Sequence, residues 1–167
     1  MAEMRHSTPS VTLEVGYATA FGDLNDWCNQ PQWALNVVKD IRQEGAQILM
    51  TTPLGEVPIE SCSSRDLGAI DIVLLGNSVL PARLTSMGDG SLVYTFTFSM
   101  PTDIPEDVFR NGQGGMEEEL QHLGRILESY AGVLACSAAS FVSQRTGPGP
   151  VLCFGVCRGP GSHGTPS

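Results

Sequence analysis

The fold is decided by residues 90–134, GSLVYTFTFSMPTDIPEDVFRNGQGGMEEELQHLGRILESYAGVL, in which two hydrophobic periods follow one another. In the first part, large apolar side chains occupy every second position: Leu92, Tyr94, Phe96, Phe98 and Met100. A period of two residues predicts a strand over residues 91–100 with the aromatic side chains on one face of a sheet.

After Pro101 the period changes to that of an amphipathic helix. Residues 105–110 have helical character, and the apolar residues beyond them are spaced four and three apart: Met116, Leu120, Leu123, Leu127, Tyr130 and Leu134. Such a stripe must be buried against an apolar surface, and the aromatic face of the preceding strand is the nearest candidate. We interpret Glu117, Glu118 and Glu119 as the first turn of this helix, where carboxylates are favourable, and not as a metal site.

The segments before residue 90 continue the strand pattern, with one helix near the N-terminus. Residues 11–15 alternate as a short strand, and residues 17–28 have helical spacing. Further strands are predicted over residues 33–42, 46–52, 56–62, 69–75 and 79–87, with a tight hairpin at residues 88–90. This order predicts an α+β fold, in which a curved antiparallel sheet of about seven strands surrounds a long C-terminal helix.

Composition and charge indicate one globular domain and argue against two classes of partner. The chain has 167 residues, of which 16% are charged and 41% hydrophobic, and its net charge is −9. An acidic surface with a single lysine, Lys39, argues against nucleic acid and against anionic membranes. No apolar run reaches the roughly 18 residues of a membrane span, so we expect no stable membrane insertion.

The termini and the cysteines lead to an expected compartment and to domain limits. Residues 1–10 are polar and no apolar segment follows them, so we expect no secretory signal, reduced thiols at all five cysteines, and a cytoplasmic protein. We expect neither a metal site nor a cofactor. The predicted parts are a flexible N-terminus (1–9), the domain (10–134), and a helix extension with a disordered tail (135–167), because glycine and proline make up 10 of the 22 residues from Thr146 onward.

Several stretches resemble bacterial, uncharacterised members of the SRPBCC superfamily, the START-related, Bet v 1-like and polyketide cyclase/dehydratase proteins. The resemblance lies in the order of elements and in Pro31-Gln32-Trp33-Ala34, residues 52–57, 67–71, 80–83, 89–97 and 119–128. It implies a helix-grip fold with a cavity between the sheet and the final helix. At about 24 cal/mol per Å³, an empty apolar void of roughly 300 Å³ would cost on the order of 7 kcal/mol, which favours an occupied cavity.

The concave face of the predicted sheet should be its more apolar face. We therefore expect ligand contacts from nine residues of the sheet, the segment before it and the final helix: Trp33, Met50, Ile72, Leu74, Tyr94, Phe96, Phe98, Leu120 and Leu123. Ile48, Ile70 and Leu127 should lie beside them. The alternative for each residue is an ordinary place in a packed core.

Two titratable residues, Asp71 and His122, have two interpretations each, and a third, Tyr94, is the better candidate for a pocket contact. Asp71 interrupts an apolar strand and is either a pocket acid or base, or a residue of the convex face near Arg83 or Arg65. His122 at the edge of the helical stripe is either a pocket imidazole or a surface residue. Tyr94 is the better candidate for a polar pocket contact, because a buried tyrosine hydroxyl usually has a hydrogen-bond partner.

Three functions remain open from the sequence. The first is binding of a hydrophobic small molecule or lipid in the helix-grip cavity. The second is an enzyme of the cyclase/dehydratase kind acting in the same cavity, for which no catalytic residue is identified. The third is a protein-interaction module with a vestigial cavity. A closed apolar pocket favours the first function, and two titratable groups inside the pocket favour the second. The ligand and the oligomeric state stay undetermined.

Overall fold

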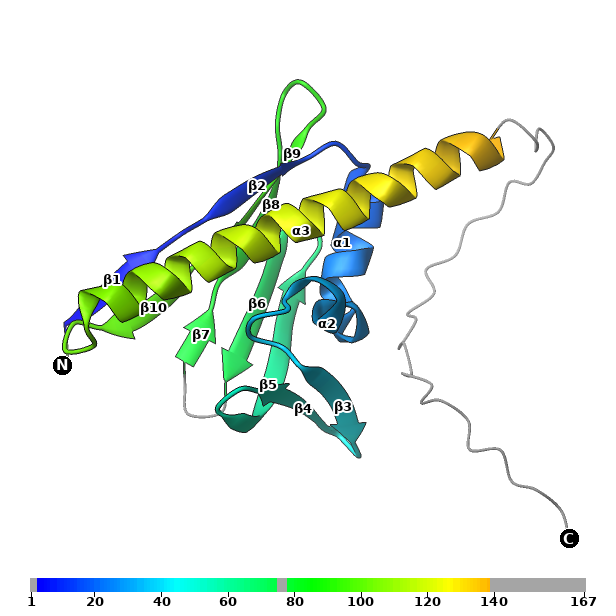
Figure 1. Ribbon diagram of the computed structural model, residues 1–167. Helices are drawn as coiled ribbons and strands as arrows, with labels where there is room; N and C mark the ends of the chain where they lie inside the picture. The colour runs from blue at the N-terminus through cyan, green and yellow to red at the C-terminus, as the bar shows by residue number, and fades with distance from the viewer. Residues whose placement is uncertain (1–2, 75–77, 139–167) are drawn as a thin grey trace, which may run out of the picture.

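The structure is a computed structural model that describes residues 3–74 and 78–138, with side chains as far as Tyr130. Its main sheet has eight strands, all antiparallel, with β7 as a branch on β6 and the remaining strands in the order β2-β9-β8-β6-β5-β4-β3. The long helix α3 (Glu106–Ala138) crosses this sheet from the β1/β10 ribbon to the side of α1 (Figure 1). This is the predicted helix-grip architecture.

Strand bounds follow the turn residues closely. The N-terminal strands are β1 (Met4–Ser7) and β2 (Ser10–Leu13), and a meander follows with β3 (Asp40–Glu44), β4 (Gln47–Thr52), β5 (Gly55–Ser64) and β6 (Ala69–Leu74). The last strands are β7 (Ser78–Leu80), β8 (Ala82–Ser86), β9 (Leu92–Phe96) and β10 (Phe98–Pro101). The segment expected to be flexible, 1–9, therefore contains strand β1, which pairs with β10.

Two predicted strands are each divided in the structure. Pro81 separates β7 from β8, since proline lacks the N–H that a continuous ladder needs. Thr97 separates β9 from β10, and its N–H bonds to the carbonyl oxygen of Pro81 at 2.8 Å. Beyond this break, β10 is no longer part of the main sheet and pairs with β1 as a separate ribbon.

One strand prediction was wrong, and two helices differ from their predicted extent. Residues 33–42 do not form a strand: α2 (Gln30–Trp33) precedes an irregular corner, and β3 begins only at Asp40. The helix predicted over 17–28 is α1 (Tyr17–Asn25) followed by a 3-10 turn, η1 (Trp27–Asn29). Helix α3 begins at Glu106, so Glu117–Glu119 lie in its interior and not in its first turn.

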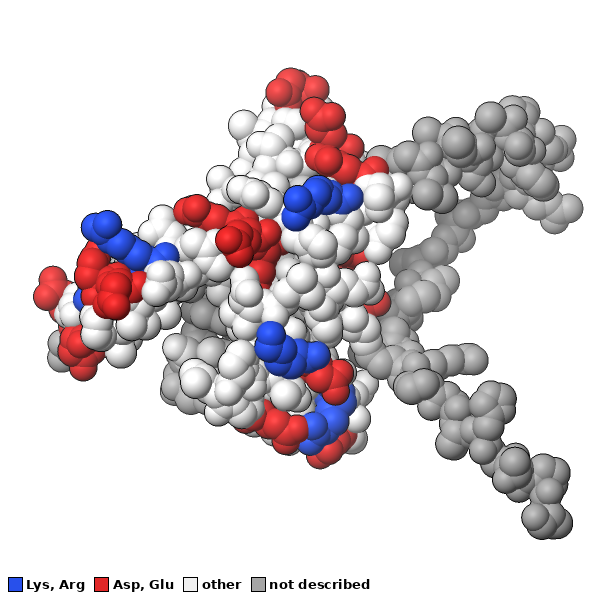
Figure 2. Space-filling model, in the orientation of Figure 1, with Lys and Arg blue, Asp and Glu red and all other residues white. Residues whose placement is uncertain are grey.

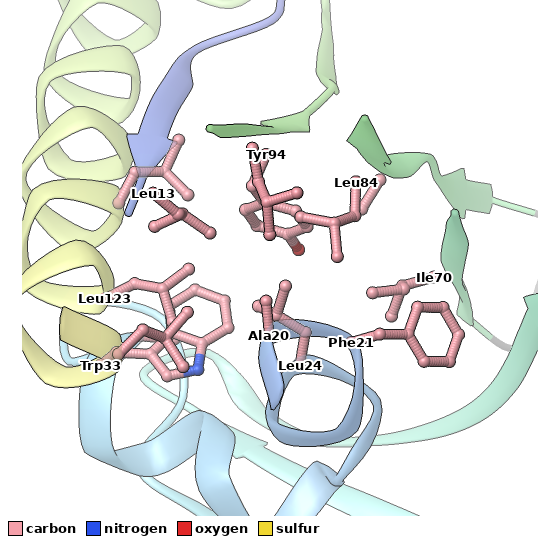
Figure 3. Packing of buried hydrophobic residues seen from close by; sticks show 14 of the residues in the cluster. Leu13, Ala20, Phe21, Leu24, Trp33, Ile70, Leu84, Tyr94 and Leu123 are labelled. Atoms are coloured by element: carbon pink, nitrogen blue, oxygen red, sulfur yellow. The ribbon is translucent and has the colours of Figure 1, made fainter. Parts of the chain in front are cut away.

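The core lies between the sheet, α3 and the two short helices. Leu13 of β2, Leu24 of α1, and Leu123 and Leu127 of α3 are almost fully buried. Figure 3 shows Leu13, Leu84, Tyr94 and Leu123 pointing into one space, with Ala20 and Leu24 of α1 below them. Gly124 lets α3 approach β2, because a methyl group there would lie 3.3 Å from Val11.

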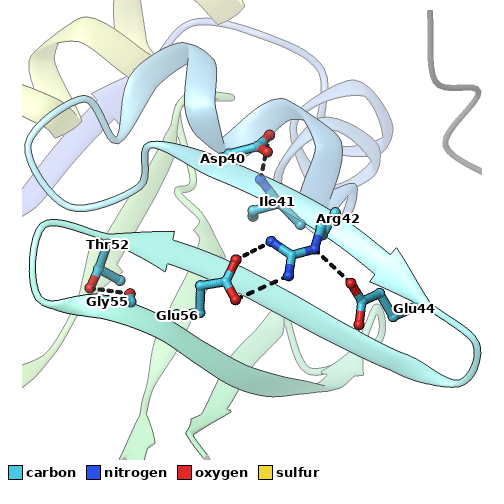
Figure 4. A network of polar contacts seen from close by, with 7 residues as sticks. All are labelled: Asp40, Ile41, Arg42, Glu44, Thr52, Gly55 and Glu56. Atoms are coloured by element: carbon cyan, nitrogen blue, oxygen red, sulfur yellow. Dashed lines mark hydrogen bonds and ion pairs between the residues drawn. The ribbon is translucent and has the colours of Figure 1, made fainter.

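Arginine side chains form ion pairs in the β1/β10 ribbon and at the β3 edge of the main sheet. Arg5 of β1 bonds to the Glu106 carboxylate at 2.6 Å and to the Thr102 carbonyl at 2.7 Å, which ties the ribbon to the start of α3. At the other end, Arg42 of β3 bonds to Glu56 of β5 across β4, and to Glu44 at 2.9 Å (Figure 4). The Arg42 guanidinium lowers the pKa of Glu56, but the pair is exposed and contributes little stability.

The surface view shows basic side chains as separate spots, most with acidic groups beside them (Figure 2). Within residues 3–74 and 78–138, no helix combines the length and the apolar character that a membrane span requires. Cys62 is a free, exposed thiol, whereas Cys28 is disulfide-bonded, so the expectation of five reduced thiols is wrong at Cys28. The tail predicted beyond residue 138 lies outside the described residues.

Candidate functional site: a cavity under helix α3

A cavity of about 60 Å³ lies between the sheet, α2 and α3. The sheet contributes Met50, Ile70, Ile72, Leu80, Tyr94 and Phe96 to its wall. The segment from α2 onward contributes Gln30, Trp33, Ala34, Val37 and Val38, and α3 contributes Met116, Glu119 and Leu120. The space admits several water molecules, but it is smaller than the roughly 300 Å³ of a ligand-sized pocket.

A wider groove of about 490 Å³ adjoins the cavity along the first half of α3. Phe98 and Met100 of β10 form one side of it, and Gly112, Gly114 and Gly115 of α3 form much of the other. Val37 and Met116 line both spaces, so the groove and the cavity adjoin each other at these two side chains.

The corner at Asn36 and Val37 is held to α3 by three hydrogen bonds. The Glu119 Oε1 atom accepts from the backbone N–H of Asn36 at 2.5 Å and of Val37 at 3.1 Å. The Asn36 side-chain amide donates to the carbonyl oxygen of Gly115 at 3.2 Å. Glu119 thereby fixes the segment that closes the cavity.

Glu119 is a buried carboxylate, with only 3% of its surface exposed. Burial raises its pKa, against the opposing effects of the two backbone donors and of Lys39. On its other side, Glu119 borders a shallow depression that His122 and Arg125 also line.

Tyr94 presents the second titratable group of the cavity wall. It is 3% exposed, and Figure 3 shows its hydroxyl directed into the interior. Burial, and secondarily the carboxylate of Asp71, raise the pKa of Tyr94, so its hydroxyl is a neutral donor at physiological pH. A neutral phenol in this position can donate a hydrogen bond to an acceptor on a bound molecule.

Six of the nine predicted ligand contacts lie at the cavity wall: Trp33, Met50, Ile72, Tyr94, Phe96 and Leu120. Phe98 lies instead in the groove, where its ring also contacts Phe109 at 5.5 Å between centroids. Leu74 and Leu123 pack into the core away from this wall.

In the structure, Asp71 and His122 both lie outside the cavity, as the surface interpretation of each residue predicts. Asp71 accepts hydrogen bonds from the Arg83 guanidinium and from the backbone N–H of Ala82 at 3.1 Å, on the face opposite the cavity wall formed by Ile70 and Ile72. His122 lies in the outer depression, with its Nδ1 atom 3.4 Å from Arg125.

Glu119 and Gln30 were missed from the sequence. Glu119 is three residues after Met116 and four before Leu123, which is a position on the apolar stripe of α3. That position was a signal of burial, obscured by the neighbouring Glu117 and Glu118. Gln30 carried no such signal, because it directly follows the predicted helix 17–28 in Asn29-Gln30-Pro31, a sequence typical of a turn that ends a helix. Among the described residues, no group of His, Cys, Asp or Glu could hold a metal ion.

Comparison with solved structures shows the fold. The chain is similar to the Zhui aromatase/cyclase from Streptomyces, with a TM-score of 0.60 and 12% identity over 75% of this chain and 94% of that one. It is also similar to the protein XoxI from Bacillus cereus, with a TM-score of 0.60 and 11% identity over 78% and 99% of the chains. An uncharacterised Bacillus thuringiensis protein gives 0.58 and 10% over 74% and 98%. No family model and no curated protein matches the sequence.

Proposed function

We propose that this protein binds a hydrophobic small molecule, with part of the ligand in the cavity under α3 and part in the adjoining groove. The observation that carries the proposal is that Val37 and Met116 line both spaces, so that a small apolar cavity and a wider groove adjoin each other beside α3. The cavity by itself is small, so a ligand of ordinary size would occupy both spaces once these side chains move apart.

The three glycines of α3 support the groove as part of the site. A glycine inside a helix costs roughly 0.5–1 kcal/mol relative to alanine, so three within four positions are expensive. A side chain at Gly114 would meet nothing within 4 Å, so packing does not explain glycine there. Glycine at position 114 is explained if the groove has to stay free of side chains.

The test is native mass spectrometry of the purified protein, combined with the binding of a hydrophobic dye. A co-purifying mass that is lost on denaturation would support the proposal. If no such mass is found and the dye ANS has no site, the binding function loses its basis.

Two alanine variants separate a binding wall from a packed core. Phe96→Ala removes a ring from the cavity wall and so enlarges the cavity. Because Phe96 is only half-buried, this variant should change the amount of bound ligand more than the free energy of unfolding. Leu123→Ala is the control: it lies fully buried outside the cavity wall and should cost about 2–5 kcal/mol with little effect on the ligand. If both variants changed ligand binding and the free energy of unfolding to the same extent, the assignment of Phe96 to a binding wall and of Leu123 to the packed core would be contradicted.

The second candidate function is a cyclase-like enzyme acting in the same cavity. The observation that favours it is the presence of two titratable groups, Glu119 and Tyr94, in one cavity wall, together with the likeness to an aromatase/cyclase. Conversion of a bound compound by the wild type, but not by Tyr94→Phe or Glu119→Gln, would distinguish this enzyme from a carrier.

A further inference from the structure

The buried polar residues of the described chain converge on one place. Gln30 is 4% exposed and Glu119 is 3% exposed, and these two are the polar or charged residues classed as buried in residues 3–74 and 78–130. Both line the cavity under α3, as does Tyr94 at 3% exposure. An otherwise apolar cavity therefore has a polar part, contributed by α2, β9 and α3.

Two of these groups lack a hydrogen-bond partner within the described part of the chain. Neither the Gln30 side-chain amide nor the Tyr94 hydroxyl bonds to another described residue. They differ from the Trp33 indole N–H, which is also unpaired but is sealed off by its neighbours. The Gln30 and Tyr94 polar atoms keep contact with open space, and the space that both residues line is the cavity. Buried polar groups of native proteins are nearly always paired, so an occupant with polar atoms is expected there.

Glu119 sets the charge that the occupant can carry. One carboxylate oxygen already accepts two backbone hydrogen bonds, so the group has little need of a further cation. A second carboxylate brought into the same low-dielectric wall would be repelled, since like charges a few ångströms apart interact strongly there. The net charge of −9 acts in the same direction.

We infer that the ligand is a neutral apolar molecule bearing a hydroxyl or carbonyl group, which pairs with the Tyr94 hydroxyl and the Gln30 amide, and that Glu119 excludes carboxylates such as free fatty acids. This inference rests on the proposed binding function and specifies the chemistry of its ligand. Tyr94 donates to the ligand oxygen, while Gln30 can both donate to it and accept from a hydroxyl.

Three probes of nearly equal shape test this chemistry: toluene, p-cresol and p-toluate, titrated at pH 7 into the full-length protein and followed by amide chemical shifts. We expect p-cresol to bind about 2–10-fold more tightly than toluene, the ratio for one net hydrogen bond, and p-toluate to bind at least about 10-fold more weakly than toluene. Equal affinities of toluene and p-cresol would overturn the inference while leaving the binding function intact. Failure of all three to bind would count against both.

Matched variants assign the effects to residues. Tyr94→Phe should remove most of the p-cresol advantage with toluene affinity unchanged, and Glu119→Gln should restore p-toluate to within a few-fold of toluene. Tyr130→Phe and Glu117→Gln are the controls, because neither residue lines the cavity. Gln30→Met, close in size to the native side chain, should also reduce the p-cresol advantage. The inference is wrong if the control variants change the probe order as much as the cavity variants do.

Discussion

Glu119 combines a buried carboxylate with two backbone hydrogen bonds, so its charge and its acceptor role can be tested separately. Glu119→Ala leaves the N–H groups of Asn36 and Val37 without their acceptor and should lower the free energy of unfolding by about 1–3 kcal/mol. Glu119→Gln keeps an acceptor oxygen and should cost less. Urea denaturation of both variants at pH 7 measures the difference, and equal losses would contradict the role of Glu119 as the acceptor for these two N–H groups.

The raised pKa of Glu119 also predicts in which direction the stability of the protein changes with pH. Burial raises the native pKa of Glu119 above 4.5, so the native state holds the proton more tightly than the unfolded state. The stabilisation from protonation is fully present below pH 4.5 and is lost as the pH rises through the native pKa. Glu119→Gln imitates the protonated form, so its stability relative to wild type should increase from pH 4.5 upward. Denaturation at several pH values measures the difference in free energy of unfolding between Glu119→Gln and wild type. Glu117→Gln is the control, for which we expect no change of this difference with pH. A difference that is also constant for Glu119→Gln would refute the prediction.

At the scale of elements, two glycines in different settings should respond oppositely to alanine. Gly114 in α3 has no atom within 4 Å of an added Cβ, so Gly114→Ala should stabilise the protein by about 0.5–1 kcal/mol. Gly68, in the turn before β6, has a φ of +62°, and its Cβ would lie 2.0 Å from the Leu84 carbonyl oxygen. Gly68→Ala should therefore destabilise the protein by about 1–3 kcal/mol or more. Thermal unfolding measures both, and a stabilised Gly68→Ala would contradict the turn geometry.

Element types were predictable where a period was long and uninterrupted. The stripe through Leu120, Leu123 and Leu127 predicted α3, and alternation predicted the strands around Ile72 and Tyr94. Prediction failed where tertiary pairing decided the outcome: β10 separates from β9 because β1 pairs with it, and no local signal at Thr97 indicates this. The corner after α2 was also missed, because its hydrogen bonds come from Glu119, more than eighty residues away.

At the scale of the molecule, the order of elements was enough for the helix-grip architecture but not for the division of its interior. Sheet alternation placed Met50, Ile72 and Phe96 on the inner face without separating cavity wall from packed core. Leu123 and Leu120 have the same character in the sequence, yet only Leu120 borders the open space. That difference depends on how α2 and the corner at Val37 pack against the end of the sheet. The hydrophobic periodicity of a sequence carries no information about such packing.

The cavity also makes a prediction about the whole molecule, because a ligand that binds only the native state raises global stability. Toluene at ten times its Kd should increase the free energy of unfolding by about 1.4 kcal/mol. Ala34 is buried in the cavity wall, so Ala34→Leu should fill the space and abolish the response to toluene, at a cost below the roughly 1–3 kcal/mol of an enlarged side chain in a filled core. Calorimetry with and without toluene measures both quantities. A large loss of stability in Ala34→Leu, with the toluene response retained, would mean that the space beside Ala34 is packed and that toluene binds elsewhere.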